Sequence, residues 1–161
     1  MTGLPLVAAC LKRMKHILEE YAGTQAVLAY MELEDLTEIE NSYGYAAAQE
    51  MMISFAECLR TLEMDENTVV FRVSETQFGA FRGNMAAELD YRLYLGELQS
   101  LSAQIRSSGD LLVSRYRCGA AVCGKQCGTV LSLENNAKAA LEYSRAHTLR
   151  FVIWQDGSMR T

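Results

Sequence analysis

Residues 69–82 read VVFRVSETQFGAFR, a stretch in which two apolar segments are separated by a polar one. The polar residues are Ser74, Glu75, Thr76 and Gln77. Short runs rich in Val and Phe on both sides of such a turn are typical of a β-hairpin. We therefore predict two neighbouring strands over 69–73 and 78–82, joined by this turn.

Apolar residues recur at three- and four-residue steps in the longer segments that surround the hairpin. This spacing places apolar side chains along one face of a helix. It predicts helices over 7–21, 46–61, 86–105 and 133–146. Short apolar runs predict further strands over 26–31, 111–123 and 151–154, and an acidic stretch from Glu32 to Glu40 is left without a predicted element.

The order of these elements defines the expected architecture. Without the first helix, the chain reads as a βαββαβ core followed by one more helix and strand. This order predicts an α+β sandwich, with a mainly antiparallel sheet of about five strands surrounded by helices. With 161 residues and no linker or repeat, we expect one domain spanning 1–161.

Composition and charge exclude several classes of function. The formal net charge of −5 argues against nucleic-acid binding, because phosphate contacts need an excess of Lys and Arg. No apolar run approaches the roughly 18 residues that span a bilayer, and the first residues lack the pattern of a signal peptide. We therefore expect a cytoplasmic protein without direct membrane contact.

Several short motifs occur in an order that matches a known family. They are Thr2-Gly3-Leu4-Pro5, Glu32-Leu33-Glu34, Ile39 with Gly44, Arg72 to Phe78, Gly119, and Ala137 to Leu141 followed by Arg145. They resemble, in turn, TGLP, D-x-D with its downstream I and G, R-x-G-G-D-E-F, S-x-G, and A-D-x-A-L-Y-x-A-K. The whole chain resembles the GGDEF domain, the diguanylate cyclase fold of bacterial second-messenger signalling.

The resemblance implies a chemistry that uses paired domains. Each domain holds one GTP with magnesium, and the 3′-hydroxyl of each GTP attacks the α-phosphate of the other to give cyclic di-GMP. Carboxylates hold the hard divalent ions in such a site. Glu32 and Glu34 stand at the D-x-D positions and are the vestigial metal candidates, with a solvated acidic loop as the alternative interpretation.

The signature turn departs from the family pattern. Ser74 and Glu75 replace its two glycines, and a left-handed conformation there would cost about 1–2 kcal/mol for each such residue. Thr76 and Gln77 replace its two acidic residues, so a carboxylate for a second metal is missing, whereas Phe78 matches the final position. We predict a degenerate turn and no catalytic residues, and the resemblance leaves open whether the turn drifted or was selected.

Four side chains are candidates for vestigial nucleotide binding. Glu40 and Asn41 stand where the family has an Asn-Asp pair that contacts guanine, and Gln49 replaces a further aspartate of that pocket. Arg145 stands where a lysine helps to bind phosphate, and its guanidinium suits that task. For Arg145 the alternative is an ordinary surface charge on a helix.

Three hypotheses follow for the function. The first is a catalytically inactive regulatory or interaction domain in cyclic di-GMP signalling, taken from a longer multidomain protein and contacting other domains of that chain or a second copy. The second is a GTP-binding sensory module that regulates an attached phosphodiesterase or cyclase domain. The third is an active diguanylate cyclase. No cofactor is expected under the first hypothesis, whereas Mg²⁺ with GTP is expected under the other two.

Overall fold

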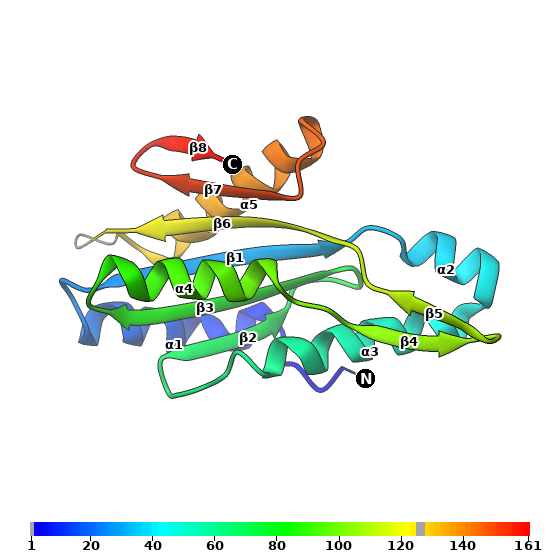
Figure 1. The fold of residues 1–161 in the computed structure, drawn as a ribbon. Coiled ribbons are helices and arrows are strands. Elements are labelled where there is room, and N and C mark those ends of the chain that lie inside the picture. Colours follow the sequence, from blue (N-terminus) through cyan, green and yellow to red (C-terminus); the bar gives the residue numbers. More distant parts are fainter. Residues whose placement is uncertain (1, 125–127) are drawn as a thin grey trace.

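The computed structural model describes residues 2–124 and 128–161. The strands of this part are β1 Gln25–Leu33, β2 Thr68–Arg72, β3 Gln77–Met85, β4 Gln104–Ser107, β5 Asp110–Val113, β6 Tyr116–Cys123, β7 Phe151–Gln155 and β8 Ser158–Arg160. The helices are α1 Val7–Glu20, α2 Leu36–Tyr43, α3 Tyr45–Arg60, α4 Glu88–Gln99 and α5 Val130–Ala146. A main sheet has the strand order β2-β3-β1-β6-β7-β8, and β4 pairs with β5 alone (Figure 1).

The main sheet is antiparallel except between β6 and β7, which run parallel. The connection between these two strands is α5, as parallel neighbours require a crossover. The predicted α+β fold with a mainly antiparallel sheet is therefore confirmed, with six strands in the main sheet where about five were expected. No helix in the described ranges is both long and apolar enough to cross a membrane.

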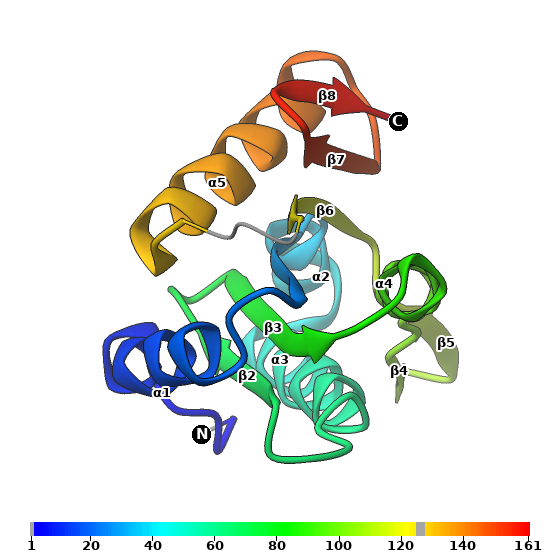
Figure 2. The ribbon, with the colours of Figure 1, turned by 90° about the vertical axis from the view of Figure 1, so that its left-hand side faces the viewer.

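Side chains of β1 alternate between the two faces of the sheet. Both faces are buried, because helices cover each of them. Val27, Ala29 and Met31 pack in one apolar cluster with residues of α3 and α4. Leu28 and Tyr30 pack in a second cluster with residues of α1 and α5. Figure 2 shows the resulting layers, with α1 and α5 on one side of the sheet and α3 and α4 on the other.

The backbone of α5 passes close to the sheet at Gly119 on β6. A Cβ atom at this position would lie 2.1 Å from the backbone nitrogen of Leu141 and 2.6 Å from its Cα, both on α5. These distances are far below van der Waals contact, and the obstructing atoms belong to a helix backbone. The glycine of the S-x-G resemblance is thus required here for the packing of α5 on β6.

Two of the predicted elements have different boundaries in the structure. The helix expected over 86–105 ends at Gln99, and residues 104–113 form the β4–β5 hairpin instead. The single strand expected over 111–123 is divided, because its first residues belong to β5 and β6 begins only at Tyr116. Ser108 and Gly109, in the turn between these strands, have φ of 52° and 83°, and two-residue hairpins favour positive φ. Leu101 and Ile105 are both buried and lie four residues apart. This spacing matches helical periodicity, which is why the helix was predicted to continue to residue 105.

Two further elements were not predicted from the sequence. The acidic stretch contains α2, which buries Leu36 and Ile39 at helical spacing while its charged residues face solvent. The chain beyond the last predicted strand turns at Asp156 and Gly157 and returns as β8. Both elements are short, and their polar residues conceal the periodicity.

Candidate functional site

The candidate site lies where β1 ends, beside the turn between β2 and β3. In the sheet register Glu32 is opposite Gln77 on β3 and opposite Arg117 on β6. The backbone N–H of Leu33 donates to the carbonyl of Thr76 at 3.0 Å, and that of Glu34 donates to the carbonyl of Arg115 at 2.9 Å. The sheet therefore holds both D-x-D positions next to the signature turn.

The first of the two carboxylates, Glu32, forms an ion pair with Arg145 near the end of α5. The Nε of Arg145 donates to Oε2 of Glu32 at 2.7 Å, and its Nη2 donates to the same oxygen. The Nη1 of Arg145 donates to Glu142 one turn earlier in the helix. The guanidinium proposed by resemblance to bind phosphate therefore pairs with the carboxylate proposed to bind metal.

The second carboxylate, Glu34, faces another arginine. The Nε of Arg117 lies 3.6 Å from Oε1 of Glu34, and both side chains are only about one-fifth exposed. Two N–H groups hold this guanidinium in place, because Nη1 donates to the carbonyls of Ser144 at 3.0 Å and Leu149 at 2.9 Å. Each D-x-D carboxylate thus has its own internal cation.

The sequence reasoning did not identify Arg117 as part of the site. A signal was present, because Arg117 stands two residues before Gly119, at the serine position of the S-x-G pattern. A large cation in place of a small hydroxyl residue, next to a carboxylate that is a metal candidate only by resemblance, could have indicated an ion pair. Arg117 and Arg145, together with Glu32, Leu33 and Glu34, line a hollow of about 260 Å³.

The residues of this hollow do not fit a divalent metal ion. Magnesium needs several oxygen ligands in near-octahedral geometry and favours charged carboxylates. Here Glu32 is hydrogen-bonded to a guanidinium, and Glu34 has an Oε1 that is buried without a hydrogen-bond partner and faces Arg117. No group of three or more His, Cys, Asp or Glu within 2–124 and 128–161 is placed to hold a metal.

The turn itself is not strained in the way the sequence suggested. Among the described residues, positive φ occurs in neither Ser74 nor Glu75, so the expected cost of a left-handed non-glycine residue is absent. The turn closes with the N–H groups of Val73 and Ser74 donating to the carbonyl of Gln77 at 2.9 and 3.2 Å. This prediction was wrong because the turn adopts a backbone that ordinary residues tolerate.

The final position of the turn has a structural role. Phe78 is fully buried, and its ring centroid lies 5.3 Å from that of Phe55 on α3. Glu75, by contrast, is exposed at the tip. Phe78 of the signature therefore belongs to the core, whereas Ser74 and Glu75 are exposed and Thr76 and Gln77 are half-buried.

The three other nucleotide-binding candidates lie on the helices that follow β1. Glu40 and Asn41 are exposed on α2, and Gln49 is half-buried on α3. None of them lines the hollow beside Arg145. The structure thus brings Arg145 together with the metal candidates Glu32 and Glu34. The predicted nucleotide-binding role of the three helix residues stays a prediction.

The opening segment of the chain is bound to the edge of the sheet beside the same turn. The N–H of Arg72 donates to the carbonyl of Pro5 at 2.8 Å, and Leu6 forms a parallel bridge to Arg72. Thr2 is buried, and its carbonyl accepts an N–H from Arg60 on α3. The TGLP segment thus covers the edge strand β2.

No family model matches the sequence, and no curated protein matches it. Solved structures do match with high structural similarity. The diguanylate cyclase SiaD from Pseudomonas aeruginosa, in complex with its activator SiaC, is 18% identical with a TM-score of 0.79, and the match covers 96% of this chain and 59% of SiaD. The chain therefore spans about three-fifths of the length of SiaD.

Two isolated domains match over nearly their full length. The GGDEF domain of YfiN (TpbB) from P. aeruginosa is 21% identical with a TM-score of 0.79, covering 94% of this chain and 98% of that one. The GGDEF domain of DgcB from Caulobacter crescentus, in complex with c-di-GMP, is 15% identical with a TM-score of 0.75, covering 96% and 92%. The chain has the fold of the GGDEF domain.

Proposed function

We propose that this chain is a catalytically inactive domain of the GGDEF fold that serves a regulatory or interaction role in bacterial c-di-GMP signalling, in the cytoplasm. The observation that carries the proposal is the pairing of Glu32 with Arg145 and of Glu34 with Arg117. Two guanidinium groups neutralise the carboxylates that a cyclase would use for its metal ions. Thr76 and Gln77 supply no further negative charge.

The proposed partners are other domains of a longer chain or a second copy of this domain. The complex of SiaD with its activator SiaC is an example of a related fold in contact with a regulatory protein. A domain that keeps the packed core but has lost the metal ligands can still present such a contact surface. The core clusters on both faces of the sheet support this, because they are complete without a nucleotide.

Incubation of the purified protein with GTP and Mg²⁺ is expected to give no c-di-GMP by chromatography. The physical reason is that the negative charge of both carboxylates is already neutralised by arginines, so that little remains to hold a metal–triphosphate complex. An active cyclase assayed in parallel controls for the conditions. Formation of c-di-GMP that disappears with Glu32→Ala would contradict the proposal and support an active enzyme.

A GTP-binding sensory module is the second candidate. It is favoured by the exposure of Glu40 and Asn41 on α2, where a carboxylate and an amide remain accessible to a purine edge. Calorimetric titration with GTP and Mg²⁺ separates the candidates. Absence of heat at millimolar GTP supports an interaction domain, whereas saturable heat that is lost in Glu40→Gln supports the sensor.

A further inference from the structure

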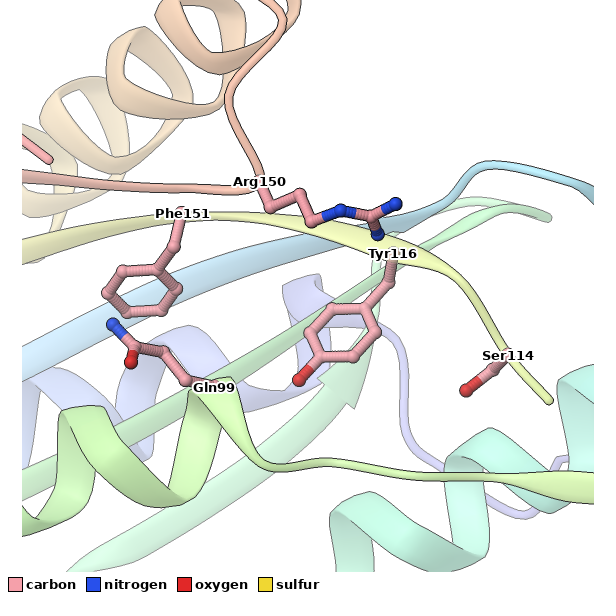
Figure 3. Close-up of a pocket in the computed structure, with 5 residues that line it drawn as sticks. All are labelled: Gln99, Ser114, Tyr116, Arg150 and Phe151. Atoms are coloured by element: carbon pink, nitrogen blue, oxygen red, sulfur yellow. The ribbon is translucent and has the colours of Figure 1, made fainter.

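A second hollow, of about 280 Å³, lies on the other face of the sheet from the Glu32–Arg145 pair. It is lined by Gln99 at the end of α4, by Ser114 between β5 and β6, by Tyr116 at the start of β6, by Arg150 just before β7 and by Phe151 at the start of β7 (Figure 3). Tyr116 reaches the α3–α4 side, where its ring centroid lies 5.2 Å from that of Phe55. Its neighbour Arg117 reaches the α5 side.

Two of the polar side chains in this hollow are already committed to the fold. The hydroxyl of Tyr116 donates to the carbonyl of Leu98 at 2.7 Å and accepts from the N–H of Leu101 at 3.1 Å. The hydroxyl of Ser114 accepts from the N–H of Ala103 at 3.2 Å. Burial raises the pKa of Tyr116 to about 12, so its hydroxyl stays neutral. These groups shape the hollow and leave it little hydrogen-bonding capacity of their own.

The remaining polar groups are the guanidinium of Arg150 and the carboxamide of Gln99. Both residues are exposed, and no carboxylate in the described part of the chain pairs with Arg150. The lining holds one cation and no acid, although the protein as a whole carries a net charge of −5. The hollow therefore has the opposite charge to that of the whole molecule and selects for an anion.

The apolar part of the lining comes from two rings. Figure 3 shows Phe151 and Tyr116 on the same side of the sheet, with the amide of Gln99 next to Phe151 and the side chain of Arg150 extended above Tyr116. Ring faces bind other planar rings by stacking or edge contacts. A cavity of about 150 Å³ holds a benzene molecule, so this volume accommodates a ring with a charged substituent.

We propose that this hollow binds a small aromatic carboxylate. The ring lies against Phe151 and Tyr116, and the carboxylate accepts two N–H groups from the guanidinium of Arg150, a geometry that planar carboxylates and guanidinium groups share. The amide of Gln99 supplies a further donor. This inference is independent of nucleotide chemistry, since none of its residues lines the hollow beside Glu32.

Titration with 4-fluorobenzoate, followed by ¹⁹F NMR of the ligand and amide shifts of the ¹⁵N-labelled protein, tests the proposal. The expected dissociation constant is on the order of a millimolar for a ligand of this size. Amide shifts are expected at 114–118 and 149–152. Arg150→Gln is expected to weaken binding by at least about tenfold, whereas Arg106→Gln, which removes an exposed arginine on β4, leaves it unchanged.

Two further probes separate the parts of the proposed ligand. Fluorobenzene supplies the ring without the charge, and inorganic phosphate supplies charge without the ring; each is expected to bind at least about fivefold more weakly than 4-fluorobenzoate. Equal binding of 4-fluorobenzoate to wild type and Arg150→Gln would overturn the proposal. Equal or tighter binding of phosphate at the same amides would also overturn it and indicate a simple anion site.

Discussion

Gly119→Ala is expected to lower the free energy of unfolding by about 3 kcal/mol, the upper end of the range for overpacked positions. The added Cβ would lie 2.1 Å from the backbone nitrogen of Leu141. A flexible side chain could rotate away from such a contact, but here the whole of α5 must move off β6. Urea unfolding followed by circular dichroism measures the change.

Gly96→Ala is the matched control for this substitution. Gly96 lies on the exposed face of α4, and a Cβ there meets nothing within 4 Å. Alanine at an exposed helical position is expected to raise the free energy of unfolding by about 0.5–1 kcal/mol. If both alanine variants unfold at the same urea concentration, α5 does not pack on β6 as closely as the structure requires.

Arg117→Ala is expected to lower the free energy of unfolding by about 2 kcal/mol, between the values for exposed and buried ion pairs. The substitution leaves the largely buried carboxylate of Glu34 without its cation. It also removes the two hydrogen bonds that Nη1 donates, one to the carbonyl of Ser144 in the last turn of α5 and one to the carbonyl of Leu149, which follows the helix. Arg106→Ala, on the exposed side of β4, is the control and is expected to change stability by less than about 0.5 kcal/mol.

A double-mutant cycle identifies the source of this loss. Adding Glu34→Gln to Arg117→Ala removes the unpaired charge, so the double variant is expected to be more stable than Arg117→Ala alone. Strict additivity of the two substitutions would show that Arg117 and Glu34 do not interact. The role of Arg117 would then be limited to its contacts with α5.

Much of the fold could be predicted from the sequence because its long helices and buried strands carry clear apolar periodicity. The unbroken apolar run of β1 and the apolar stripe of α5 are examples, and the motif order supplied the family resemblance. The elements that escaped prediction are α2, β8 and the β4–β5 hairpin, and they bury few residues. The strand β4 buries only Ile105, and β5 and β8 bury none. In α2, Leu36 and Ile39 are separated by exposed polar residues.

The candidate site was predictable only in part. Glu32, Glu34 and Arg145 stand at motif positions, so their types and places were evident from the sequence. The pairing of Glu32 with Arg145 depends on the approach of α5 to the end of β1. The pairing of Glu34 with Arg117 depends on the register of β1 and β6. The backbone of the turn could not be predicted either. The comparison with two glycines suggested positive φ, whereas Ser74 and Glu75 adopt a turn with no positive φ at either residue.

The central claim is that Arg145 and Arg117 neutralise the carboxylates of Glu32 and Glu34, the two candidate metal ligands. Electron paramagnetic resonance of Mn²⁺ with GTP tests it directly, since Mn²⁺ replaces Mg²⁺ at oxygen sites. Adding the wild-type protein is expected to leave the spectrum of Mn²⁺–GTP unchanged. A protein-bound Mn²⁺ signal that is present in wild type and disappears in Glu32→Gln would contradict the claim.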